Sequence, residues 1–122
     1  MEDFVTFKLA KKLKENGFDY PCIAHYNINL ELKVVIREPI FWHSDVLSYT
    51  DAPTISQVLK WLSEEKNIYV SVFIDDDSDC PVTYEIYVGT ECVRTHHGEY
   101  FALKDWSKCE LRAIEYVIDN LI

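Results

Sequence analysis

The residues with the clearest capacity for chemistry are a run of four aspartates and one serine at positions 75–79. Oxygen ligands at alternating positions of a loop can surround a calcium ion. The EF-hand calcium loop, however, needs glycine at its sixth position and glutamate at its twelfth, and these positions hold Cys80 and Ile86. The flanking residues also alternate like strands, whereas helices flank an EF-hand. We interpret the run as a solvated hairpin tip; weak calcium binding is the less favoured alternative.

The histidines and cysteines do not have the spacing of a metal site either. His96 and His97 are adjacent, and adjacent side chains on a strand point to opposite faces, so these two cannot share one ion. His25 and His43 are distant in the sequence, and no two of the four cysteines form a CxxC pair that would support zinc. We predict no metal and no cofactor.

No pattern of catalytic residues is recognisable. The sequence contains no P-loop, no GxGxxG motif and no nucleophile elbow, and its three glycines could hardly supply a phosphate-binding loop. We therefore predict no catalytic residues and expect a protein that is not an enzyme. The alternative is an enzyme or small-ligand-binding protein with an unfamiliar site, which would require a deep apolar pocket with a few converging polar groups.

The charge balance restricts the partners. Twelve basic residues against 21 acidic ones give a net charge of −9. A field of this sign repels phosphate, so we predict no direct binding to nucleic acid. The excess of carboxylates is interpreted first as a source of solubility. An alternative is an acidic decoy that mimics nucleic acid and occupies a basic nucleic-acid-binding protein.

The cellular location is also predicted from composition. Residues 1–4 contain neither a basic segment nor an apolar core, so they do not resemble a signal peptide. No apolar run approaches the roughly 18 residues of a membrane span. We expect a cytoplasmic protein with no membrane association and with reduced cysteines. A disulfide between Cys80 and Cys92 is a minor alternative, because they flank a predicted strand and turn.

The spacing of apolar residues predicts the elements that position these groups. The length of 122 residues is typical of one domain, residues 1–122. We predict an α+β fold with a single antiparallel sheet of four to six strands and about three helices, packed mainly on one face. The expected order is a helix at 6–16, strands at 21–26 and 30–37, a link at 38–52, a helix from 53 to about 66, strands at 68–74, 82–88 and 91–96, and a helix from 105 or 107 to 122.

Four local signals refine the ends of these elements. Gly17 and Phe18 are typical of a Schellman stop to the first helix, with the glycine in the left-handed region. Asparagines at 27 and 29 predict a hairpin turn, because asparagine tolerates positive φ. Pro53 suits the first turn of the second helix. Residues 107–110 (sequence SKCE) fit a capping box for the last helix.

The strict alternation of the later strands predicts two different sheet faces. One face, containing Val70, Val72, Ile86 and Val88, should meet the helices. The other face carries aromatic side chains, and an exposed apolar patch of this kind usually marks an interface. The alternative is that the first helix or the 38–52 link covers this face. The long link also holds several bulky rings, although part of it could be a further edge strand. The candidate interaction surface comprises Phe41, Trp42, His43 and Tyr49 from the link and Tyr69, Phe73 and Tyr87 from the sheet.

A resemblance to a known family is carried by segments at both ends and in the middle of the chain: 3–7, 12–18, 21–26, 51–62 and 113–122. On these segments the whole chain resembles a family of small uncharacterised proteins from gut anaerobic bacteria and their mobile elements. The resemblance implies an α+β domain and an association with prophages; it implies no activity and no functional residues. Residues 31–49 are least like the family, which suits a variable surface.

Together these patterns favour a small, non-enzymatic cytoplasmic protein-interaction module. Its expected partner is another protein or a second copy of itself. The partner's identity does not follow from the sequence, because no motif in it specifies a ligand.

Overall fold

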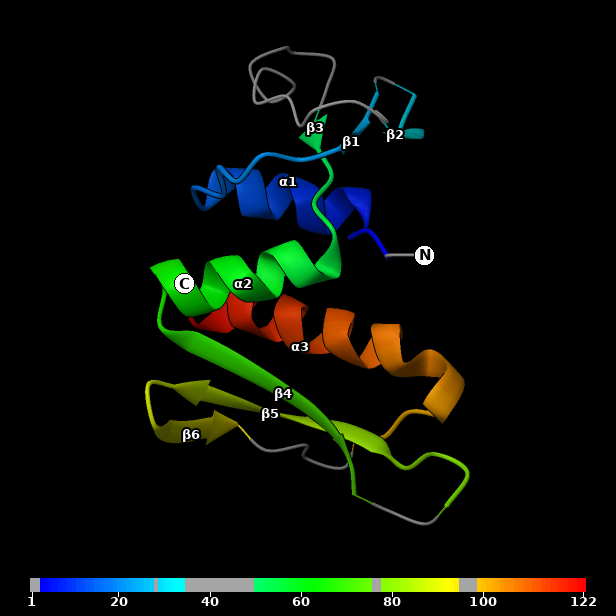
Figure 1. Ribbon diagram of the computed structural model, residues 1–122, viewed down its shortest axis with the longest axis vertical. Helices are drawn as coiled ribbons and strands as arrows, with labels where there is room; N and C mark the ends of the chain where they lie inside the picture. The colour runs from blue at the N-terminus through cyan, green and yellow to red at the C-terminus, as the bar shows by residue number, and fades with distance from the viewer. Residues whose placement is uncertain (1–2, 28, 35–49, 76–77, 95–98) are drawn as a thin grey trace. The chain divides into compact units, whose positions relative to one another are not determined.

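The computed structural model describes residues 3–27, 29–34, 50–75, 78–94 and 99–122 (Figure 1). Within these residues it contains three α-helices and two three-stranded antiparallel sheets. The predicted α+β class is confirmed, but the strands form two sheets rather than one. The chain groups into two compact units, Met1–Val58 and Leu59–Ile122. No helix in the described part of the chain is long and apolar enough to cross a membrane.

The first unit begins with helix α1 (Phe7–Glu15), whose C-terminal end follows the predicted signal. The hydroxyl of Thr6 accepts a backbone N–H of the first turn at 3.3 Å. At the other end, the N–H of Phe18 donates to the carbonyl of Leu13 at 2.9 Å, and Gly17 has a φ of +91°. This is the Schellman motif predicted from the sequence. Apolar side chains spaced four residues apart are buried on one side of this segment: Val5, Leu9 and Leu13.

A small sheet follows in the order β2-β1-β3, formed by β1 (Ala24–Tyr26), β2 (Leu32–Val34) and β3 (Thr50–Asp51). Strands β1 and β2 are the predicted hairpin, shorter than expected within the described residues. Strand β3 shows that the end of the 38–52 link pairs as a strand, as one alternative held. The rest of that link lies outside the described residues.

The hairpin turn between β1 and β2 differs from the prediction. The side-chain Oδ1 of Asn27 accepts the N–H groups of Asn29 at 2.9 Å and of Glu31 at 3.0 Å. Among the described residues of the turn, the positive φ, 61°, belongs to Leu30 and not to an asparagine. The reason is geometric. The N–H of Asn27 donates to the carbonyl of Glu31 at 3.0 Å, which leaves the three-residue loop 28–30, and such loops commonly have their last residue in the left-handed region.

Helix α2 (Ile55–Glu65) starts from the first unit and ends in the second. Its start is a capping box, since the hydroxyl of Thr54 accepts the N–H of Gln57 at 3.2 Å and the Oε1 of Gln57 accepts the N–H of Thr54 at 2.9 Å. Pro53 therefore precedes the cap, and its predicted position in the first turn is wrong. The side-chain amide of Gln57 also donates to the carbonyl of Pro21 at 2.7 Å.

The second unit contains the larger sheet, in the order β4-β5-β6. Strands β4 (Ile68–Ile74) and β5 (Val82–Val88) have the predicted bounds, and β6 (Glu91–Arg94) has the predicted start. The turn between β5 and β6 consists of two residues, and Gly89, the first of them, has a φ of +62°. The common two-residue hairpin turns require a positive φ at this position, which glycine adopts readily.

Helix α3 (Trp106–Asn120) lies along one face of this sheet (Figure 1). A short 3-10 turn, η2 (Leu103–Asp105), leads directly into it. The capping box predicted at 107–110 is wrong, because Ser107 already lies in the first turn and Asp105 occupies the cap position. The buried apolar residues of the sheet and of α3 are Ile68, Val82, Tyr84, Ile86, Cys109, Ala113, Ile114, Val117 and Ile118.

Candidate interaction surface

Strands β4 and β5 present alternate side chains to α3. On that face Val70 lies opposite Ile86, which is fully buried. On the other face Tyr69 lies opposite Tyr87, and 46% of Tyr69 is exposed. Side chains alternate along a strand, and residues directly opposite each other in an antiparallel pair share a face. The predicted alternation is therefore confirmed, with Val70 and Val72 half-buried and neither of them fully exposed.

We name the side of this sheet that faces away from α3 the open face. The end of this face near Thr83 is not accessible to a partner, because Thr83 is buried and its hydroxyl donates to the carbonyl of Glu99 at 2.8 Å. On the opposite side of the sheet, Val88 differs from the prediction, because it lies at the end of β5 and is 40% exposed. The accessible residues of the open face are Tyr69, Ser71, Phe73, Glu85, Tyr87 and Cys92.

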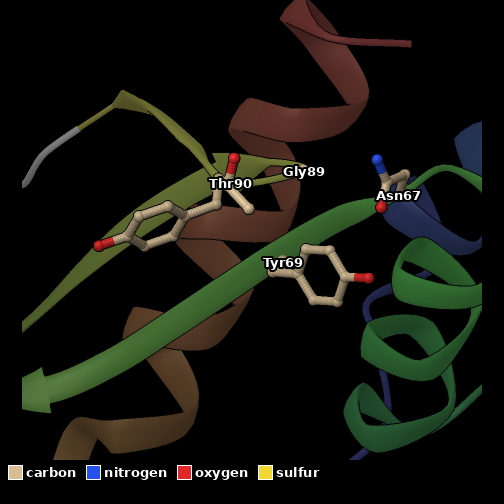
Figure 2. A pocket seen from close by; sticks show the side chains of 5 residues that line it. Asn67, Tyr69, Gly89 and Thr90 are labelled. Carbon is tan, nitrogen blue, oxygen red and sulfur yellow. The ribbon is translucent and has the colours of Figure 1, made fainter.

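One end of the open face is hollowed between the two tyrosines and the β5–β6 turn (Figure 2). Asn67 and Tyr69 project from the start of β4, and Thr90 projects from the neighbouring turn. The N–H of Gly89 donates to the carbonyl of Asn67 at 2.9 Å, which ties the turn to the start of β4. A Cβ at Gly89 would lie 3.3 Å from the Nδ2 of Asn67, so the position favours glycine. The hollow is open to solvent and mostly apolar, with Tyr87 as its fifth lining residue.

The open face also carries a polar pair. The hydroxyl of Tyr87 donates to the carboxylate of Glu85, two residues earlier on the same strand. This hydrogen bond raises the pKa of Tyr87 above its ordinary value, with smaller contributions from desolvation and from the charge of Glu85. The surface therefore offers uncharged phenol rings beside one carboxylate. This combination suits ligands that are both apolar and cationic.

The structure brings together part of the predicted surface. Tyr69 and Tyr87 are direct cross-strand partners, and Phe73 lies further along the same face, half-buried. The four link residues Phe41, Trp42, His43 and Tyr49 lie outside the described residues.

A second cluster of polar side chains was not predicted. Glu99 accepts hydrogen bonds from the Tyr84 hydroxyl at 2.9 Å and from the Arg112 Nε at 2.8 Å. The Nη2 of Arg94 lies 3.2 Å from the same carboxylate. The guanidinium carbon of Arg94 lies 3.9 Å from the ring centroid of Tyr116, in a cation–π contact. We name these five residues the Glu99 cluster.

Electrostatics explain what the Glu99 cluster does. Partial burial opposes ionisation of Glu99, but the hydrogen bonds from Arg112, Tyr84 and Arg94 outweigh this effect, so its pKa lies below the ordinary value. Burial, opposed in part by the hydrogen bond from Arg94, raises the pKa of Tyr84. A carboxylate held ionised by three donors is a poor proton acceptor. The cluster is thus suited to joining β5, β6 and α3 rather than to acid–base catalysis.

The cysteines are free thiols in this structure. Cys80 and Cys92 are exposed and not bonded to each other, while Cys22 and Cys109 are buried. Burial raises the pKa of both buried thiols to about 12, with a smaller contribution from the charge of Asp51 at Cys22 and of Glu110 at Cys109. In the described ranges, no three His, Cys, Asp or Glu side chains are grouped to hold a metal ion.

The chain was compared with known proteins at three levels. Protein-family models, curated proteins and solved structures give no significant match.

Proposed function

We propose that the chain is a small, non-enzymatic cytoplasmic interaction module that docks a partner protein on its open face. The observation that carries this proposal is the pairing of Tyr69 with Tyr87 on the side of the sheet opposite α3. Tyrosine is enriched at protein interfaces, because its ring covers apolar area at a small entropic cost while its hydroxyl remains able to hydrogen-bond. The four free thiols are in keeping with a reducing, cytoplasmic compartment.

The chemistry of the open face indicates the kind of partner. Two phenol rings favour apolar side chains and the cation of arginine or lysine, and Glu85 adds a negative charge beside them. The net charge of −9 attracts basic segments from a distance. We therefore propose that the partner contributes an extended segment in which basic and apolar side chains alternate.

Two rival functions make different predictions. An enzyme or small-ligand protein would use a deep pocket, whereas the hollow beside Tyr69 is open to solvent. An acidic decoy would also bind a basic partner, but its affinity would depend on carboxylates spread over a surface and would fall steeply with salt. The interaction module depends on the tyrosine rings, so its affinity should fall only moderately with salt.

Binding of defined peptides separates these proposals. The probe is a synthetic peptide of about ten residues that alternates arginine with leucine, and the control peptide has glutamate in place of arginine. Titration calorimetry should detect binding of the arginine peptide alone. Backbone amide shifts in NMR should then change at Ser71, Glu85 and Cys92 on the open face.

The variant Tyr69→Ala tests the surface directly. It should weaken binding of the arginine peptide by about tenfold, which is roughly 1.4 kcal/mol and is typical of a buried interface tyrosine. Leu103→Ala is the matched control, because Leu103 is 59% exposed and lies off the open face. Equal loss of binding in the two variants, or equal binding of the two peptides, would refute the proposed docking site.

A further inference from the structure

The outer edge of β4 is a second surface, distinct from the open face. In the sheet order β4-β5-β6, β4 pairs with β5 on one side only. Across the described residues, no backbone group other than those of β5 pairs with Ile68–Ile74. An unpaired edge presents a row of N–H and C=O groups that can pair with another strand.

This edge lacks the features that normally prevent such pairing. Natural edge strands are protected by charged side chains, prolines, bulges or short length. Strand β4 has seven residues, IYVSVFI, with no charge and no proline. Its register with β5 runs through all seven residues without a bulge. The strand is therefore long, regular and uncharged, which are the properties of an edge that is used.

We propose that β4 pairs antiparallel with β4 of a second copy of this chain, about a twofold axis, so that two three-stranded sheets become one continuous sheet. Closed twofold dimers are the commonest assemblies of identical chains, and strand addition at a sheet edge is a common way to build them. The proposal uses backbone groups at the edge and does not rest on the proposed docking function of the open face.

The side chains of β4 favour one register. In a continuous sheet, residues directly opposite each other must share a face. An odd-numbered residue of one β4 must therefore lie opposite an odd-numbered residue of the other. The register with Ser71 opposite Ser71 of the second copy is the one in which all seven residues have partners. It places Tyr69 opposite Phe73 of the second copy, which is an aromatic cross-strand pair.

The negative charge at the end of β4 favours the antiparallel direction. Lys66 precedes β4 and Asp75 follows it, and both are exposed. In the register above, antiparallel pairing places Asn67 of each copy opposite Asp75 of the other, with Lys66 next in sequence. Parallel pairing would instead bring Asp75 next to Asp75.

Substitutions at Ser71 test the dimer, because Ser71 is exposed and lies on the proposed axis. Sedimentation velocity of the full chain, up to about 500 µM, should show a monomer–dimer equilibrium, as expected for a small interface. Ser71→Glu should raise the dissociation constant at least tenfold, because like charges directly opposite each other repel. Ser71→Ala should leave it within about twofold. Circular dichroism confirms that each variant is folded.

Two further results decide the register and exclude a general effect of charge. An equimolar mixture of Ser71→Glu and Ser71→Lys should form a dimer more tightly than Ser71→Glu alone. In a Cys80→Ser, Cys92→Ser background, oxidation should cross-link Ser71→Cys into a dimer and leave Thr90→Cys, on the β5–β6 turn, as a monomer. A wild-type chain that stays monomeric at all concentrations, or a Ser71→Glu variant that associates like wild type, overturns the proposal.

Discussion

Glu99 and Arg112 are joined by a 2.8 Å hydrogen bond from the arginine Nε to the carboxylate, and this contact connects the residues before η2 with the middle of α3. Because Tyr84 and Arg94 also hydrogen-bond Glu99, one carboxylate connects β5, β6 and α3. The depressed pKa of Glu99 means that its ionised form is stabilised more in the folded state than in the unfolded state.

The first prediction concerns the pH dependence of this contact. A depressed folded pKa contributes stability above the unfolded pKa of about 4.3, and this contribution is lost as the pH falls through the folded pKa. Glu99→Gln should therefore lower the free energy of unfolding by about 1 kcal/mol at pH 7, since Arg112 is half-exposed and solvent screens the pair. Urea unfolding should show the difference shrinking toward pH 3. Glu115→Gln, which removes an exposed pair with Arg112 at 3.7 Å, serves as the control and should change little. If the loss of unfolding free energy in Glu99→Gln were the same at every pH, this account would be contradicted.

The second prediction concerns the turn between β1 and β2. Leu30 has a φ of 61° and is 59% exposed, so its side chain provides little packing to offset the strain of the left-handed region. Leu30→Gly should raise the free energy of unfolding by about 0.5–1 kcal/mol, because glycine adopts this φ without steric conflict. Leu103→Gly is matched in exposure but lies in a 3-10 turn, and it should lower stability instead. Thermal unfolding of the two variants should therefore shift in opposite directions; a shift of the same sign would argue against relief of strain.

The third prediction concerns the thiols. Cys22 and Cys109 are buried, and burial raises their pKa to about 12, so they carry almost no thiolate at pH 8. Cys80 and Cys92 are exposed. Mass spectrometry after brief treatment with iodoacetamide should find the two exposed thiols alkylated in the native protein and all four alkylated in urea. Rapid labelling of Cys22 or Cys109 without denaturant would show that these sites open readily.

The fourth prediction concerns Gln57, whose side-chain Oε1 accepts the N–H of Thr54 at the start of α2 and whose side-chain amide donates to the carbonyl of Pro21 at 2.7 Å. Gln57→Ala removes a capping partner and leaves that carbonyl without this donor, so it should lower the free energy of unfolding by about 2 kcal/mol. Ser56→Ala, an exposed neighbour in the same turn, should change it by less than about 0.5 kcal/mol. Chemical denaturation compares the two, and similar losses would mean that the capping box and the Pro21 contact contribute little.

Local patterns made much of this fold predictable. The strict alternation of apolar residues in β4 and β5 predicted both the bounds of these strands and the face on which Tyr69 and Tyr87 lie. Residues directly opposite each other in an antiparallel pair lie on the same face of the sheet. Gly17 was equally informative, since few other residues adopt its φ at low cost. These features depend on neighbours in sequence or on a single long-range pairing.

The Glu99 cluster was not predictable because a β-bulge changes the face of the sheet on which the later residues of β6 lie. Tyr87 pairs with Cys92, yet Ile86 pairs with Arg94 and not with Val93. Uninterrupted alternation would have placed Val93 toward α3 and Arg94 on the open face. The inserted residue leaves Val93 exposed and directs Arg94 to the side of Tyr84. A shift of this kind depends on pairing geometry, and it has no signature in residue composition.

The boundaries that were missed depend on competing local signals. Asp105 and Ser107 are both good helix caps, and the 3-10 turn that ends at Asp105 places the start of α3 before Ser107. At Leu30, pairing of the two strands across the hairpin determines the loop length, so the residue at the third loop position adopts positive φ despite its type.

The uncharged composition of β4 also has a consequence for the handling of the protein. A seven-residue segment in which all residues but one serine are β-branched or aromatic, without charge or proline, is the kind of sequence that forms amyloid-like fibrils when many copies stack. Pairing between two copies would bury this segment in a closed assembly, whereas conditions that separate the copies would leave it available for open-ended growth. Fibril formation followed by thioflavin fluorescence should therefore start sooner for a chain that is folded but unable to pair than for the wild-type protein.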